Sequence, residues 1–150
     1  MTSFTQQVLP LGMPMTPVWG YGGEAKDAVT GALLGYVRNS PAPSFEAIRG
    51  IPNQVTWINN ITTPHMFPVD PTLHWADPNN FGMPMPPFTA YPPGYPEAQS
   101  PVPLVTHLHG GEVQSYFDGG PDEWFTWDGK QGPGYSTLIT TDSNAAVYYY

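Results

Sequence analysis

Apolar and polar positions alternate in short stretches of the chain, which is the pattern of half-buried β-strands. Within residues 44–59, Val55 and Trp57 alternate with Thr56, and Gly50 opens a break that extends to position 53. This segment therefore predicts two strands separated by a turn.

The second half of the chain repeats the pattern. Residues 102–109 alternate, and "GPGYSTLITT" and "NAAVYYY" are two further strand candidates with a turn at 142–144 between them.

Between the strands predicted within 44–59 and those from 102 onward, residues 62–101 contain eleven prolines and no sustained period. Such a segment predicts a long loop that lies on the surface or covers a site.

The first 40 residues give weaker signals. Residues 1–23 predict an extended arm that ends in the glycine turn of "VWGYGG". Residues 24–40 fit either one short helix or a hairpin, and Gly31 and Gly35 weaken the helix.

Composition strengthens the β assignment. The chain has 150 residues, which suits one domain, and its 20 prolines and 16 glycines interrupt long helices. Hydrophobic residues make up 40% and aromatic residues 14% of the chain, enough to form a core rather than a disordered chain. We expect an all-β domain with long proline-rich loops.

Net charge and the lack of targeting signals limit which binding partners we expect for this chain. Lys and Arg number 4 against 12 Asp and Glu, a net charge of −8, so we expect neither nucleic acid nor an anionic membrane as a partner. No apolar run reaches the roughly 18 residues of a membrane span. The N-terminus has no signal-peptide pattern, so we expect the chain as given to be soluble. It has no cysteine, which excludes disulfides and thiolate metal ligands within it.

The stretch "VTHLHGG" at residues 105–111 is the main candidate for chemistry. In a strand, side chains two positions apart share a face, so His107 and His109 would present parallel imidazoles to neighbouring metal ions. Imidazole binds Cu, Zn, Fe and Ni, and Gly110 would let the backbone turn directly after the pair. The alternative is a pair of exposed or hydrogen-bonded strand histidines without a metal.

The tetrapeptide "GMPM" occurs at residues 12–15 and again at 82–85. Thioethers at this spacing can bind Cu(I), but methionine next to proline also packs extended segments against aromatic rings. We favour packing.

A longer stretch around the histidines, "PLVTHLHGGEVQSYFDGGPDEWFT", resembles the first copper-binding segment of multicopper oxidases, in particular bacterial laccases of the spore-coat and bilirubin-oxidase type. Residues 18–23, 40–61 and 65–78 resemble successive segments of that family's first cupredoxin domain, in the same order. A cupin fits less well, because Glu112 comes one residue too early and Pro101 stands where a cupin has glycine.

The resemblance implies a cupredoxin-like Greek-key β-sandwich that is incomplete at its C-terminal end. Residues 44–150 would form the first part of this domain, and residues 1–43 an N-terminal arm with an insertion. In the family the next His-x-His segment follows an aromatic pair like that of "VYYY". We therefore expect the remaining strands and domains to lie outside this chain, and the isolated chain to be aggregation-prone or partly unfolded.

The resemblance also implies the site residues. His107 matches a ligand of the type 2 copper, His109 matches a ligand of a type 3 copper, and Asp118 matches an acidic residue that helps deliver protons to the trinuclear cluster. For Asp118, a turn-capping role before Gly119 is equally compatible with the sequence.

Other polar and aromatic residues near these segments have simpler interpretations. The family has no ligands in the proline-rich loop, so its histidines are expected to be exposed or to pack against the loop. Nearby acidic residues are expected to be solvated, and the aromatic pair after them to fill the core. The loop histidines are His65 and His74, the acidic residues are Glu112, Asp122 and Glu123, and the aromatic pair is Trp124 and Phe125.

The implied function is one-electron oxidation of a phenol-like or metal-ion donor with reduction of oxygen to water. The type 1 copper needs a Cys and two His from outside this chain, so the expected partner is the remaining part of the oxidase, as a second polypeptide or a missing C-terminal portion. The alternative is a small cupredoxin-like copper-binding module without oxidase activity. The localisation stays open, because members of the family are exported or occur in spore coats.

Overall fold

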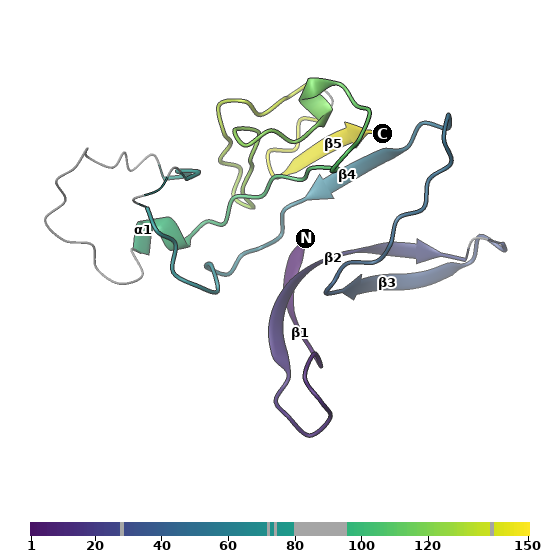
Figure 1. Ribbon diagram of the computed structural model, residues 1–150, viewed down its shortest axis with the longest axis horizontal. Helices are drawn as coiled ribbons and strands as arrows, with labels where there is room; N and C mark the ends of the chain where they lie inside the picture. The colour runs from purple at the N-terminus through teal and green to yellow at the C-terminus, as the bar shows by residue number, and fades with distance from the viewer. Residues whose placement is uncertain (28, 72, 74, 80–95, 139) are drawn as a thin grey trace, which may run out of the picture. The chain divides into compact units, whose positions relative to one another are not determined.

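The computed structural model describes residues 1–150 except 28, 72, 74, 80–95 and 139, and it divides into two compact units, Met1–Ile51 and Pro52–Tyr150 (Figure 1). Strands in both units are antiparallel, and the helices among the described residues are a single short α-helix and one 3₁₀ turn. The all-β prediction is therefore confirmed, and the strands are consistent with part of a cupredoxin-like β-sandwich. The domain boundary between 43 and 44 stays a prediction.

The first unit is a three-stranded sheet in the order β1-β2-β3 (Figure 1). Its strands are β1 (Thr2–Gln6), β2 (Thr16–Lys26) and β3 (Leu33–Asn39). The first half of β2 pairs with β1 and the second half with β3. Most of residues 1–23 are extended, as predicted, but they are paired as β1 and β2, and the predicted glycine turn at 18–23 is wrong because these residues continue β2.

Between β2 and β3 the chain forms the hairpin that was one of the two alternatives for residues 24–40. The carboxylate of Asp27 accepts hydrogen bonds from the backbone N–H groups of Val29 and Thr30, at 3.0 and 2.6 Å. An Asp that binds backbone groups two and three positions on is a typical turn device. It closes the loop and excludes the helix.

The second unit contains the remaining strand pair, β4 (Gln54–Ile58) and β5 (Ala145–Tyr149), with Thr56 opposite Val147. Along β4, Val55 and Trp57 are half-buried and Thr56 is exposed, as the alternation predicted. The helical turns of this unit are α1 (Pro96–Gln99) and the 3₁₀ turn η1 (Ser115–Phe117). None of the helices that the structure describes is long and apolar enough to cross a membrane.

Three predicted strands are not present. Residues 44–49 and the described part of 132–141 have no regular strand, and residues 102–109 contain only a single bridge from Leu104 to Phe125. The alternation along 102–106 still predicts which side chains are buried, because Val102, Leu104 and Thr106 are at most 8% exposed. A prolonged ladder does not form there, because prolines at 101 and 103 lack the N–H groups that it requires.

The core of the second unit surrounds a polar residue. Trp124 and Phe125 are buried, as predicted, and so is Asn59 with 0% exposure. The Asn59 amide donates to the backbone carbonyls of Val102 and Phe125 at 3.0 and 2.9 Å, and its oxygen accepts the N–H of Ile61 at 3.0 Å. One side chain therefore ties the end of β4 to two segments distant in sequence.

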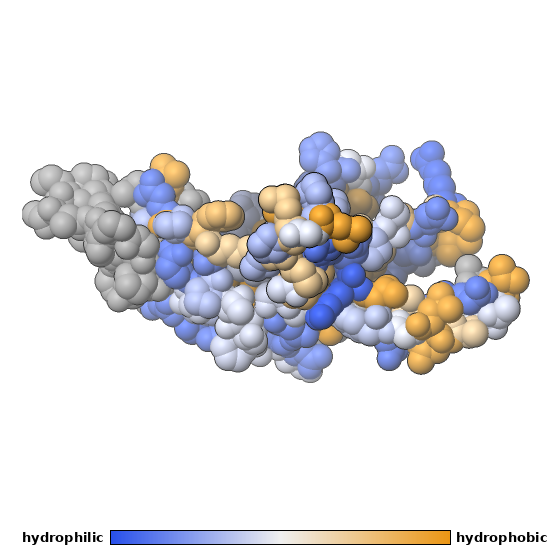
Figure 2. Space-filling model, turned by 90° about the horizontal axis from the view of Figure 1, so that it is seen from below, coloured by the Kyte–Doolittle hydropathy of each residue, from blue (hydrophilic) through white to orange (hydrophobic). Residues whose placement is uncertain are grey.

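Apolar side chains also remain at the surface, as the orange atoms in Figure 2 show. In the first unit Leu33, Leu34 and Tyr36 of β3 are 61, 64 and 60% exposed, and in the second unit Phe67 and Leu138 are 80 and 75% exposed.

Candidate metal centre

The histidine pair lies where the buried segment 102–106 leaves the core. His107 and His109 are both exposed, and the hydrogen bond from the Gly111 N–H to the Leu108 carbonyl, at 2.9 Å, turns the chain directly after them. The ring centroids are 6.0 Å apart, with an angle of 78° between the ring planes. The predicted strand with parallel imidazoles is thus wrong, because the segment carries no ladder beyond Leu104. The two rings nevertheless lie side by side.

Asp118 reaches the same place from a different part of the chain. Its backbone oxygen lies 2.5 Å from Nδ1 of His107, and its carboxylate Oδ1 lies 3.4 Å from the same nitrogen. Both side chains are 45% exposed. The structure therefore brings His107 into contact with both other residues that the sequence singled out.

Gly119 explains how Asp118 reaches His107. Its φ is +72°, and a Cβ at this position would lie 1.7 Å from the backbone oxygen of Thr106 and 3.3 Å from the Cα of His107. Only glycine allows two backbones to approach so closely in this conformation. From sequence, Gly119 is only a turn neighbour of Asp118, because a "DGG" stretch does not reveal which backbone it contacts.

Two further contacts hold the loop that carries Asp118. The Asp118 N–H donates to the Ser115 carbonyl at 3.3 Å, which ends the η1 turn, and the Gly120 N–H donates to the Glu123 carboxylate at 2.9 Å. Glu123 was expected to be a solvated acid. Its carboxylate instead binds the backbone of this loop and is half-buried.

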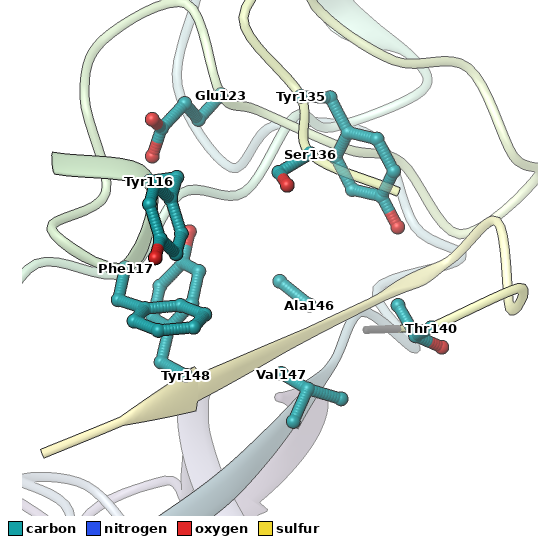
Figure 3. A pocket seen from close by; sticks show the side chains of 9 residues that line it. All are labelled: Tyr116, Phe117, Glu123, Tyr135, Ser136, Thr140, Ala146, Val147 and Tyr148. Atoms are coloured by element: carbon teal, nitrogen blue, oxygen red, sulfur yellow. The ribbon is translucent and has the colours of Figure 1, made fainter. Parts of the chain in front are cut away.

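Aromatic side chains pack this loop onto β5. Figure 3 shows Tyr116, Phe117 and Tyr148 gathered on one side of a small pocket, with Tyr135 and Ser136 across from them. The rings of Tyr116 and Phe117 meet edge to face at 4.5 Å, and Phe117 lies 6.4 Å from Tyr148. Ring pairs at these distances are stabilising, so these contacts hold η1 against β5.

Burial raises the pKa of Tyr148 to about 12, and the nearby Glu123 carboxylate contributes to the increase. In the unfolded chain a tyrosine titrates near pH 10. The folded state keeps its proton to higher pH, so this contribution to the unfolding free energy is complete below pH 10 and is lost as pH rises from 10 to about 12. We expect a loss on the order of 2–3 kcal/mol. Denaturant titrations across this range should show the slope in the parent protein and in Tyr149→Phe, but a much smaller slope in Tyr148→Phe.

The other sequence candidates do not join the pair. The backbone N–H of His65 donates to the Gln99 carbonyl of α1 at 2.8 Å, and burial lowers the pKa of its imidazole. In the first "GMPM", Met13 and Met15 are 50 and 54% exposed, so they do not show the expected packing. His74 and the second "GMPM" lie outside the described residues.

The chemistry of the donor set fits copper in part. Two adjacent, half-exposed imidazoles suit Cu(II), which binds nitrogen ligands tightly, and a hydrogen bond on the second ring nitrogen is usual for metal-binding histidines. Within the part of the chain that the structure describes, no group of three or more His, Cys, Asp or Glu side chains could hold a metal ion. The residues therefore fit part of a copper centre and not a whole one.

Comparisons with known proteins give the family. No protein-family model matches the chain. No solved structure matches it. Multicopper oxidase LPR2 of Arabidopsis thaliana is 32% identical over 129 residues, which are 86% of this chain and 17% of that protein. The laccases of Haloferax volcanii and Bacillus subtilis are 33 and 30% identical over 88 and 81% of the chain, and 18% of each laccase is covered.

The fold and the site define a class of protein: an all-β chain with an exposed His-x-His pair beside a carboxylate. The relatives narrow the class: by sequence, the chain belongs to the multicopper oxidase family. The chain spans 17–18% of the length of these three relatives.

Proposed function

We propose that this chain supplies two ligands of the trinuclear copper cluster of a laccase-like multicopper oxidase, His107 to the type 2 copper and His109 to a type 3 copper. The observation that carries the proposal is the convergence at the pair: the two rings lie 6.0 Å apart, and Asp118, eleven residues further on, contacts the first of them. The relatives named multicopper oxidase and laccase support copper as the metal.

Bound copper would supply one-electron chemistry, with a phenol-like or metal-ion donor oxidised and oxygen reduced to water. The residues of this chain would hold the metal ions and transfer protons. The imidazoles of His107 and His109 hold metal ions as neutral nitrogen ligands. The Asp118 carboxylate, 45% exposed and next to His107, is placed to pass protons between solvent and the cluster.

The rest of the centre lies outside these 150 residues in this proposal. Two imidazoles do not complete a copper cluster, and the sequence has no cysteine for a type 1 copper. The relatives are several times longer than the chain. Exposed apolar side chains such as Leu33 and Leu138 supply surface against which the remaining part of the oxidase can pack.

Removing either ligand tests the proposal. In the complete oxidase, His107→Ala and His109→Ala should each lower copper content by at least one ion per protein and reduce oxygen consumption by more than about 100-fold, while the blue absorption of the type 1 copper stays. His65→Ala is the control, because it removes an imidazole at a position outside the His-x-His pair. Full copper content and normal oxygen consumption in both ligand variants would contradict the assignment.

Asp118→Asn separates ligand binding from proton delivery. The amide keeps the shape of the side chain and removes its charge, so copper content should stay unchanged while oxygen consumption falls by about 10²-fold or more. Reduction of the blue copper by the donor, followed by stopped-flow absorbance without oxygen, should keep its rate. Unchanged oxygen consumption would mean that Asp118 is only a turn residue.

The alternative function is a copper-binding module without oxidase activity. The specific observation in its favour is that the described residues present the pair without a third metal-binding side chain. The intact mass and metal content of the native material decide between the two. A complex with further histidine and cysteine ligands and several coppers supports the oxidase, whereas a stable protein of 16.4 kDa with one weakly held copper supports the module.

A further inference from the structure

We propose that the backbone carbonyl of Asp118, and not its carboxylate, orients His107 for metal binding, and that Gly119 is the residue that positions this carbonyl. The proposal deepens the function above and rests on it for the ligand role of His107. The arrangement of the groups themselves is independent of that role.

The distances favour the carbonyl. Nδ1 of His107 lies 2.5 Å from the Asp118 backbone oxygen but 3.4 Å from the nearer carboxylate oxygen. A separation of 3.4 Å is longer than an ordinary N–H···O hydrogen bond, whereas the carbonyl oxygen lies within hydrogen-bond distance of the ring nitrogen. The carboxylate is therefore an electrostatic neighbour, and the hydrogen bond goes to the backbone.

A carbonyl oxygen can only accept a hydrogen bond, so Nδ1 must carry the proton. In the neutral ring, the other nitrogen then holds its lone pair free. A carboxylate 45% exposed can rotate or be screened, but a backbone carbonyl has no side-chain rotamers. The carbonyl thus fixes both the tautomer and the direction of the ring before any metal arrives.

Gly119 determines where this carbonyl points, because its Cα packs on the backbone of the segment that carries the histidine. The Thr106 oxygen would lie 1.7 Å from a Cβ at position 119, and Thr106 is only 4% exposed. The Asp118 N–H is also held by the Ser115 carbonyl at 3.3 Å. Both peptide groups that flank Asp118 are therefore restrained without help from its side chain.

Because the backbone and the side chain of Asp118 are restrained independently of each other, this residue has two separable functions. Its backbone would position the ligand, and its carboxylate would remain available for protons. A substitution of the side chain alone should then leave the orientation of His107 intact, whereas a change at Gly119 should disturb it.

The experiment is ¹⁵N NMR of the histidine rings in the complete, metal-free protein, at a pH where the histidines are neutral, with His107 assigned through a His107→Gln variant. We expect the His107 proton on Nδ1 in the parent protein and in Asp118→Ala. In Gly119→Ala we expect that signal to be lost or mixed with the other tautomer. Gly110→Ala, with a φ of +79° and open space around its Cβ, should behave as the parent.

The outcomes separate this proposal from the function on which it rests. A His107 proton on Nε2 in the parent protein, or a shift to Nε2 in Asp118→Ala, would overturn the proposal, and the second result would make the carboxylate the orienting group. Asp118→Ala keeps the test decisive should Gly119→Ala fail to fold. If copper never binds His107 while its tautomer behaves as expected, the proposed function fails and the positioning role of the backbone stands.

Discussion

Gly119→Ala should abolish most metal binding at His107, although the substitution removes neither histidine from the sequence. The new Cβ would lie 1.7 Å from the Thr106 oxygen, and φ at this position is +72°, so the backbone of the loop has to move away. The carbonyl of Asp118 moves with it and releases the His107 ring. Loss of such a supporting hydrogen bond lowers metal affinity by about 10–100-fold, and we expect a decrease in the unfolding free energy of about 2–4 kcal/mol from strain and overlap.

Gly110→Ala is the matched control for this substitution. Gly110 follows the histidine pair directly and has a φ of +79°, but a Cβ there would meet nothing within 4 Å, so only the conformational penalty of about 1–2 kcal/mol applies. Copper titration of the complete oxidase and denaturant unfolding of the same preparations measure the two effects. Equal copper affinities in the two variants would show that the contact between Gly119 and Thr106 has no role in the site.

Asn59→Ala is expected to lower the free energy of unfolding of the second unit strongly. Its fully buried side chain serves two carbonyls and one N–H, at 3.0, 2.9 and 3.0 Å, and alanine would leave all three without these hydrogen bonds. The Phe125 carbonyl keeps its hydrogen bond from the Leu104 N–H at 2.9 Å, so alanine leaves the Val102 carbonyl and the Ile61 N–H unsatisfied. Each buried group left unsatisfied costs about 1–3 kcal/mol, so we expect a loss of about 2–6 kcal/mol. Asn59→Asp should be at least as harmful, because a carboxylate would face two carbonyl oxygens.

The neighbouring Asn60 provides the control, because its side chain is exposed and Asn60→Ala should change stability by less than about 0.5 kcal/mol. Thermal or denaturant unfolding of the complete protein measures the difference. The effect should extend to the copper site, since one carbonyl held by Asn59 belongs to Val102, five residues before His107. A stability change under about 1 kcal/mol for Asn59→Ala would mean that water replaces the amide.

The pattern of consecutive residues was sufficient to predict two strands, the burial of an aromatic pair and the proximity of the two histidine rings. Alternation around Val55 and Trp57 predicted β4, the aromatic run predicted β5, and the burial of Trp124 and Phe125 followed from their apolar character. The His-x-His spacing likewise placed two rings close together, because two residues in extended backbone have few ways to be far apart.

The same local reasoning failed for two segments whose hydrogen-bond partners, or lack of them, are decided elsewhere in the chain. The alternating residues 102–109 predicted a strand, yet two prolines and the absence of a continuous ladder leave a single bridge at Leu104. Residues 16–23 were expected to end an arm in a glycine turn, but they belong to the central strand of a sheet. Pairing of this kind depends on which other segment supplies the opposite edge.

By itself, then, the sequence determined the β character of this chain and its family, and it singled out the histidine pair as candidate metal ligands, because composition, period and motif are properties of consecutive positions. Only the tertiary structure decided that Asn59 holds the core together and that Gly119 brings the Asp118 carbonyl to His107. Those roles rest on contacts between groups that are 11 to 66 residues apart. An asparagine or a glycine looks the same in sequence whether or not a distant carbonyl lies beside it, so only the folded chain distinguishes the two cases.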